Sequence, residues 1–197
     1  MKNRLFLVLY LSSALFANAQ FDSSYIKSVY NKIMAMHSPD VIYYGDHPSK
    51  MIFPDALKGM NGGFEEIRKK GVDFTRKERK FLKRKLPKLI DSGVPDQLFP
   101  ESRRLGSDTI CDFLSKKYRE GYELLKSKGD TIDIRKKLGR FWSWAYFIAE
   151  PIYIRGKTIR VSYFAYFLHD SGESVIDIEI LKGGIWRRIG VLSGVAY

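Results

Sequence analysis

The chain of 197 residues holds 34 Lys and Arg side chains against 22 Asp and Glu side chains, which gives a formal net charge of +12 at pH 7. Hydrophobic residues make up 45% and aromatic residues 14% of the sequence, enough for a packed core, so intrinsic disorder is excluded. The single cysteine, Cys111, excludes an intrachain disulfide scaffold. A chain of this length predicts one domain, with two small subdomains as the alternative.

The first 19 residues have the pattern of a cleaved secretory signal peptide. Lys2 and Arg4 form a basic start, and a mainly apolar stretch of 12 residues follows from Leu5 to Phe16. Ala17-Asn18-Ala19 then has the small-x-small pattern that signal peptidase accepts. A helix that spans a bilayer needs about 20 apolar residues, so this stretch is too short for a membrane anchor. The pattern predicts an exported protein, periplasmic or extracellular, with no transmembrane span.

The region that follows, residues 20–140, has mainly helical patterns. Apolar residues recur with the helical period from Ser24 to Met36 and again from about Thr109 to Lys126, so each stretch predicts an amphipathic helix. Between them, residues 48–63 are rich in turn-forming residues, and Asn61-Gly62-Gly63 is the strongest signal for a break in the chain. We therefore expect turns rather than a helix there.

Most of the net positive charge lies in the basic segment, residues 68–88, which holds 11 basic and two acidic side chains. Thr75 and Glu78 have the Ser/Thr-x-x-Glu spacing of a capping box, which predicts a helix that begins at Arg76. Residues 92–106 follow the segment, and their glycines and prolines indicate a linker.

Along the basic segment and one residue past its end, Leu82, Leu86 and Leu89 recur at i, i+4 and i+7 and predict a narrow apolar stripe, while Pro87 predicts a kink or restart of the helix. A basic amphipathic helix is compatible with contact to a polyanion, whereas a run of exposed charges more often forms a solvated face that only keeps the protein soluble. No nucleic-acid-binding module surrounds the segment, so the expected polyanion is an anionic envelope surface or a glycan rather than a specific nucleic acid. The candidate contact residues are Lys80, Lys83, Arg84 and Lys88.

From residue 141 to residue 197, the apolar residues recur with a period of two, which predicts β-strands. The longest candidate runs from Thr158 to Leu168, after a tight turn at Arg155-Gly156-Lys157. Short connections make sequential strands pair antiparallel, so we expect a meander of four or five strands. Helices followed by strands indicate an α+β fold, in which the helices of residues 20–140 pack on the meander as one domain.

Two motifs in the C-terminal third carry a resemblance. Ala149-Glu150-Pro151-Ile152-Tyr153-Ile154 and Gly183-Gly184-Ile185-Trp186 are similar to the Pro-Ile-aromatic strand and the Gly-x-Trp hairpin that end a group of small secreted proteins found in Bacteroidota. Ala-Asn-Ala-Gln at residues 17–20 fits the same group. The resemblance implies a secreted protein with a C-terminal meander, and it implies no particular activity.

Residue types suited to catalysis or metal binding are few. Cys111 is expected to be a buried, inert thiol on its predicted helix. His169-Asp170-Ser171 are contiguous, whereas the members of a catalytic triad converge through space. Four metal-ligand types lie within 11 residues, in a spacing that fits no common metal motif: His37, Asp40, Asp46 and His47. We assign no catalytic, metal-binding or cofactor-binding residue, and we expect no cofactor.

Aromatic residues cluster on the predicted strands, where they either fill the core or line an open sheet face. Trp144 and Trp186 fall on apolar positions and are predicted to be buried and structural. The residues expected to face a ligand are Glu150, Tyr163, Tyr166 and His169. Two functions stay open: a non-catalytic binding or envelope-associated domain, which we favour, and a small hydrolase-like enzyme with a site at the mouth of the curved sheet. The oligomeric state is left open by the sequence.

Overall fold

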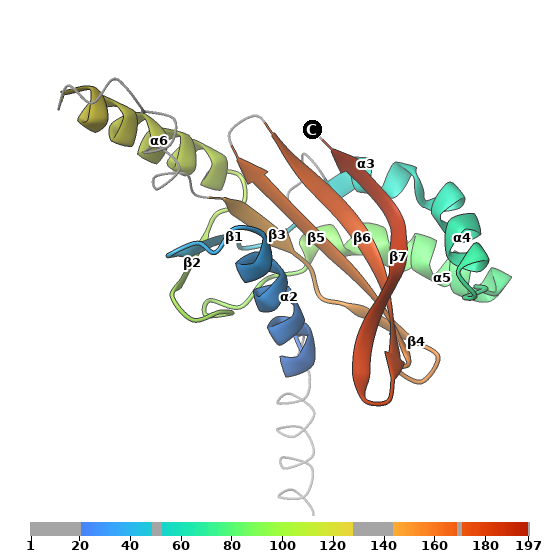
Figure 1. Cartoon of the computed structure of the whole chain (residues 1–197). Coiled ribbons are helices and arrows are strands. Elements are labelled where there is room, and N and C mark those ends of the chain that lie inside the picture. Colours follow the sequence, from blue (N-terminus) through green and yellow to red (C-terminus); the bar gives the residue numbers. More distant parts are fainter. Residues whose placement is uncertain (1–20, 49–52, 128–143, 169–170, 197) are drawn as a thin grey trace, which may run out of the picture. The chain divides into compact units, whose positions relative to one another are not determined.

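The structure is a computed structural model, and it describes residues 21–48, 53–127, 144–168 and 171–196 (Figure 1). The signal peptide predicted for residues 1–19 lies outside the described residues. Among the helices that are described, none combines the length and apolar character needed to cross a membrane. The chain divides into two compact units, residues 1–37 and residues 38–197.

The first unit contributes helix α2 (Ser23–Met36) to the described part of the chain. Asp22 caps this helix, because its carboxylate accepts a hydrogen bond from the backbone amide of Tyr25 at 2.8 Å. Tyr25, Val29 and Ile33 recur at i, i+4 and i+8 and are its buried residues. The helix predicted from the apolar period is confirmed.

The second unit contains the other described elements. Its helices are α3 (Phe53–Lys58), α4 (Met60–Lys69), α5 (Arg76–Lys85), the 3-10 helix η1 (Leu86–Asp91) and α6 (Ile110–Ser127). Its strands are β1 (Ile42–Gly45), β2 (Ser102–Leu105), β3 (Ala145–Ile148), β4 (Ile152–Ile154), β5 (Ile159–Leu168), β6 (Ser171–Lys182) and β7 (Ile185–Ala196).

Within the described residues, seven strands form one mixed sheet in the order β2-β1-β3-β5-β6-β7, with β4 also paired to β5. Strand β5 is antiparallel to β3, β4 and β6, and β6 is antiparallel to β7. Strand β1 is parallel to both β2 and β3. The predicted α+β fold with a C-terminal antiparallel meander is therefore confirmed, within a larger mixed sheet.

Strands β3 and β4 lie end to end along the same edge of β5, because β6 occupies its other edge over the full length of the strand. Ile148 lies opposite Phe164 and Ile152 lies opposite Val161, so this edge carries one more residue than its partner. Such an extra residue is a bulge. Pro151 has no amide hydrogen and tolerates this break in the ladder.

The linker interpretation of residues 92–106 is wrong at its end, where strand β2 pairs in parallel with β1. The chain before β2 is anchored by the hydroxyl of Tyr44, which accepts the amide of Leu98 at 3.1 Å and lies 2.8 Å from the carbonyl oxygen of Pro95. These partners lie more than 50 positions from Tyr44, so no local pattern indicates them.

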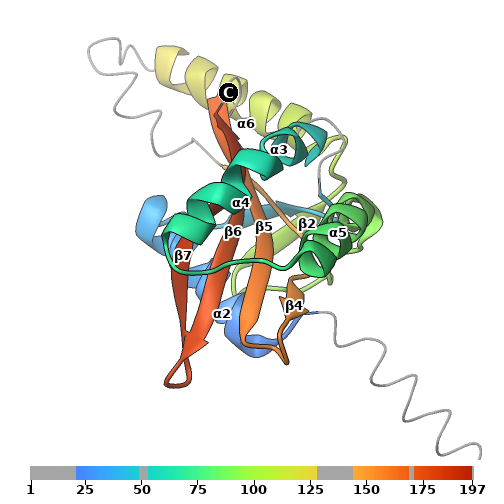
Figure 2. The ribbon, with the colours of Figure 1, turned by 90° about the vertical axis from the view of Figure 1, so that its right-hand side faces the viewer.

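The expected break at Asn61-Gly62-Gly63 is also wrong, because these residues lie inside helix α4. A Cβ atom at Gly63 would overlap the backbone carbonyl oxygen of Leu192 in β7. Gly63 therefore lets the backbone of α4 lie directly against the backbone of β7. Figure 2 shows α3 and α4 against the β6–β7 side of the sheet.

One face of the sheet forms the core together with helices α3 to α6 and η1. Leu82, Leu86 and Leu89 are all buried in this core, as the stripe predicts. Helix α5 ends at Lys85 and continues as the 3-10 helix η1, with Pro87 in its first turn, so the predicted restart is confirmed. The basic segment is thus fixed to the sheet by its leucines, and its polar side is left facing outward.

Candidate functional site

The capping box at the start of α5 is formed as predicted. The hydroxyl of Thr75 accepts the amide of Glu78 at 3.2 Å, and a carboxylate oxygen of Glu78 accepts the amide of Thr75 at 2.7 Å. These two hydrogen bonds satisfy two amides that a helix start leaves open, and the helix begins at Arg76.

Two arginines form ion pairs with the acidic residues of the basic segment, Asp73 and Glu78. Arg79 pairs with Glu65 of α4 at 3.2 Å and with Asp73 at 3.1 Å, and it lies against the ring of Phe64. Arg155, from the turn between β4 and β5, pairs with Glu78. The nearby carboxylates are therefore already engaged with cations that belong to the scaffold.

Five other cations of α5 and η1 are exposed to solvent. We call this surface the basic face and define it by the exposed side chains Arg76, Lys77, Lys80, Arg84 and Lys88. Among the residues that the structure describes, none of the five forms an ion pair with a carboxylate. At about 100° per residue, the four that lie on α5 fall on the side opposite the buried Leu82.

Three of the four predicted polyanion contacts, Lys80, Arg84 and Lys88, lie on the basic face. The fourth, Lys83, is also exposed, but its ammonium donates a hydrogen bond to the side-chain oxygen of Asn61 in α4 at 2.6 Å. Lys83 therefore lies at the α4 side of the basic face and is partly held by the scaffold.

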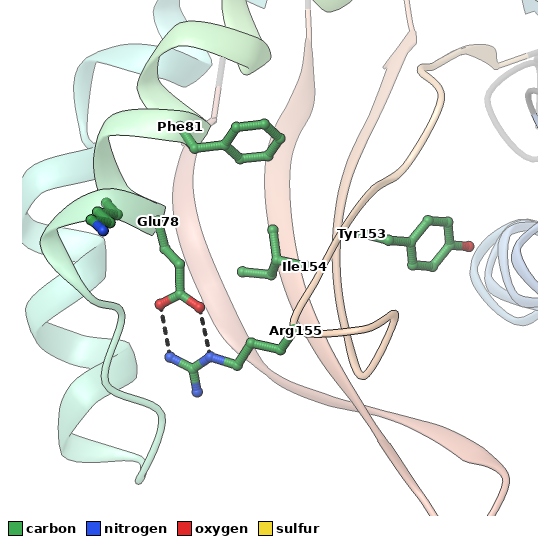
Figure 3. A pocket seen from close by; sticks show the side chains of 6 residues that line it. Glu78, Phe81, Tyr153, Ile154 and Arg155 are labelled. Atoms are coloured by element: carbon green, nitrogen blue, oxygen red, sulfur yellow. Dashed lines mark hydrogen bonds and ion pairs between the residues drawn. The ribbon is translucent and has the colours of Figure 1, made fainter.

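A shallow cleft of about 350 Å³ lies beside α5, between the helix and strand β4. Its lining residues are Lys77, Glu78, Phe81, Tyr153, Ile154 and Arg155. Figure 3 shows the Glu78–Arg155 pair at one end of the cleft, with Phe81 and Ile154 on the same side of the strand and the ring of Tyr153 pointing away. The cleft is lined by apolar side chains, by the Glu78–Arg155 ion pair, whose two charges cancel, and by Lys77.

The Glu78 carboxylate is bound by Arg155 through two hydrogen bonds of 2.7 and 2.9 Å. These bonds, with a smaller contribution from Thr75, lower the pKa of Glu78 to about 2. The Glu78 carboxylate is therefore ionised and paired with Arg155 at neutral pH, so it is unsuited to donate a proton. No sequence signal indicated this pair, since the two residues are 77 positions apart.

Glu150 lies at the bulge between β3 and β4 and is half-buried. Burial raises the pKa of Glu150, and the nearby ammonium of Lys85 opposes that rise. Glu150 therefore lies at the edge of the sheet, where the charge of Lys85 offsets part of the effect of burial.

Of the four residues expected to face a ligand, Tyr163 and Tyr166 lie on opposite faces of the sheet. Tyr163 is fully buried on the helix side of the sheet, with its ring 4.6 Å from that of Phe53. Tyr166 is on the opposite face, where its hydroxyl donates to Glu173 at 2.9 Å. His169 lies outside the described residues.

The loop that contains Asp46 and His47 is held by Ser107. The Ser107 amide donates to the Asp46 carboxylate at 2.8 Å, and the His47 amide donates to the Ser107 hydroxyl at 3.1 Å. In the described part of the chain, no three His, Cys, Asp or Glu side chains are grouped closely enough to hold a metal ion. Asp46 and His47 thus act in closing this loop onto the start of α6.

The expectation of a buried Cys111 is wrong, because this residue is exposed on α6. Ile110 and Leu114 are the buried residues of that turn, and position 111 is rotated by about 100° from Ile110. Trp144 and Trp186 are half-buried rather than fully buried. Both lie at positions that the helices α3 to α6 do not cover.

Comparison with known proteins finds no match for this chain among protein-family models, curated proteins or solved structures.

Proposed function

We propose that the protein is an exported, non-catalytic domain that attaches to an anionic surface of the cell envelope through the basic face. The observation that carries the proposal is the separation of the charges in the basic segment. Its acids are bound by Arg79 and Arg155, while five cations point outward without an acidic partner in the described residues. Export is proposed on the signal-peptide pattern alone.

The cations of the basic face repel one another and so destabilise the protein when no ligand is bound. Arg76, Lys80 and Arg84 recur at i, i+4 and i+8 along α5, and Lys88 follows four residues later. Like charges at this spacing destabilise a helix by about 0.2–0.5 kcal/mol per pair. A bound polyanion removes this repulsion and releases counterions, so binding should be strongly salt-dependent.

The state of the carboxylates supports binding rather than hydrolysis. Glu78 is bound by Arg155, Asp177 by Arg188 at 2.7 Å, and Glu179 by the fully buried Arg160 at 2.7 Å. A hydrolase needs a carboxylate or nucleophile that reaches its substrate. These three carboxylates instead neutralise cations of the scaffold.

The test compares two variants that lose the same charge. In the first, three residues of the basic face are replaced: Lys80→Gln, Arg84→Gln and Lys88→Gln. The control carries Lys116→Gln, Arg119→Gln and Lys126→Gln on the exposed side of α6. We expect the first variant to elute from heparin, and to leave anionic vesicles, at a clearly lower salt concentration than the control. Equal elution of the two variants would show that only net charge matters and would overturn the proposal.

A further inference from the structure

The hairpin between β6 and β7 extends beyond the rest of the sheet. The last pair between β5 and β6 joins Ile159 to Ile180, and the next amide, that of Leu181, donates to the carbonyl of Thr158 at 2.9 Å. Residues 181–186, which we call the hairpin tip, therefore have only each other as strand partners. Figure 1 shows this hairpin reaching past the ends of β5 and β4.

The hairpin tip is apolar and exposed. Ile185 is 61% exposed and Leu181 is 38% exposed. Leu181 pairs with Trp186 and their side chains lie on one face of the hairpin, while Ile185 lies on the other. Hairpin turns normally carry polar residues, so two exposed aliphatic side chains and a half-buried tryptophan around a Gly-Gly turn call for a partner.

Ile185 is exposed because helix α4 stops short of the hairpin tip. The side chains of Ile67 and Lys70, at the end of α4, lie over Gly190 of β7. Ile189, directly before Gly190, still packs against the core, whereas Ile185 at the start of β7 is exposed. The half-buried ring of Trp186 has the guanidinium of Arg160 4.5 Å from its centroid and the ring of Tyr153 at a centroid distance of 5.8 Å.

Cations surround the apolar side chains. Lys182 and Arg187 belong to the hairpin, and Lys157 lies in the neighbouring turn between β4 and β5. All three are exposed, and none forms an ion pair with a carboxylate of the described residues. The nearest acids, Asp177 and Glu179, are bound by Arg188 and Arg160.

We propose that the hairpin tip inserts Leu181, Ile185 and the ring of Trp186 into the surface of a bilayer that contains anionic lipids. The inference rests on the proposed function, and it identifies the anionic surface as lipid. Aliphatic side chains gain free energy in the acyl region, tryptophan favours the interface, and the flanking cations meet lipid phosphates. A soluble glycan offers no apolar layer for Ile185, and a second copy of this basic chain would bring like charges together.

The hairpin tip and the basic face are linked through one turn. Arg155 in the turn between β4 and β5 binds Glu78 in the first turn of α5, and Thr158 in the same turn binds Leu181. The start of the basic face therefore lies at the same end of the sheet as the hairpin tip. A bilayer that receives the tip is within reach of Arg76 and Lys77.

The experiment measures binding to vesicles of phosphatidylcholine with phosphatidylglycerol and, in parallel, retention on heparin. The variant Leu181→Ser, Ile185→Ser removes the exposed aliphatic side chains, and the control Phe113→Ser, Leu124→Ser removes two exposed apolar side chains from α6. We expect the tip variant to bind vesicles about tenfold more weakly than wild type, with unchanged heparin elution, and the control to bind as wild type does.

A second measurement does not depend on the stability of the tip variant. Quenching of wild-type tryptophan fluorescence by brominated lipids should exceed that of a Trp186→Phe variant. Unchanged vesicle binding by the tip variant, equal quenching of the two proteins, or dimers that dissociate when the tip is altered would overturn the inference. Heparin has no apolar layer, so heparin elution tests the basic face alone. If the tip variant binds vesicles as wild type does while the basic-face variant still elutes from heparin at lower salt, this inference is overturned and the proposed function is not.

Discussion

Glu78 and Arg155 lie 77 positions apart in the sequence and are joined by two hydrogen bonds, from the arginine Nε at 2.7 Å and from its Nη2 at 2.9 Å. The same arginine donates to the backbone carbonyl of Asp73 and lies 5.8 Å from the ring of Phe74. One side chain of the sheet thus holds the start of α5 and the loop before it.

Glu78→Gln should destabilise the protein by about 1–2 kcal/mol, because a charged hydrogen-bonded pair becomes a neutral one. Glutamine also completes a capping box, so the loss reports on Arg155 rather than on the cap. Urea unfolding measures the change, with Glu66→Gln on the exposed side of α4 as the control. If both variants unfold at the same urea concentration, the pair contributes nothing to stability.

The pH dependence of stability should reflect the ionisation of Glu78. The folded-state pKa of Glu78 is about 2, below its ordinary value of 4.5, so its contribution is complete above about pH 4.5 and is lost as the pH falls toward 2. We expect the free energy of unfolding of wild type to fall more steeply across that range than that of Glu78→Gln. Parallel curves for the two proteins would contradict the assignment.

Adjacent glycines in α4 should respond in opposite directions to alanine. Gly62→Ala should stabilise the protein by about 0.5–1 kcal/mol, because nothing lies within 4 Å of the added Cβ and alanine favours a helix. Gly63→Ala should destabilise it by about 1–3 kcal/mol, because the Cβ would overlap the carbonyl of Leu192. Thermal unfolding of both variants measures the difference. A stabilised Gly63→Ala protein would contradict the close approach of α4 and β7.

Export predicts a shortened chain in the native host. The pattern that ends at Ala19 predicts that the secreted protein lacks its first 19 or 20 residues. Intact-mass measurement of the protein from the periplasm or the medium tests this directly. Recovery of the full-length chain from the membrane fraction would contradict the prediction, and an Ala19→Arg variant, which blocks cleavage, serves as the control.

Much of the fold follows from local sequence patterns. The period of two over residues 158–168, the capping box at Thr75 and the leucine stripe each depend on neighbours within a few positions, and each is confirmed. The errors arise where distant partners decide the structure. Strand β2 exists because β1 lies beside it, and Gly63 is helical because it packs on β7.

The candidate site, too, is only partly predictable from local sequence. The charge of the basic segment is evident in the sequence, but which cations are left unpaired depends on Arg79 and Arg155, whose partners come from other elements. The hairpin tip was missed because Ile185 and Trp186 continue the apolar pattern of a buried strand. The exposure of Ile185 depends instead on where helix α4 ends over β7.

The short outer strands β2 and β4, at one side of the sheet, affect whether molecules associate by strand addition at high concentration. An unpaired strand edge is a template on which another chain adds by backbone hydrogen bonds. Here the outer strand β2 spans four residues and carries the exposed Arg103 and Arg104, and β4 spans three residues directly after Pro151. Short length, positive charge and a missing amide each oppose strand addition, so this side of the sheet resists the growth of fibrils.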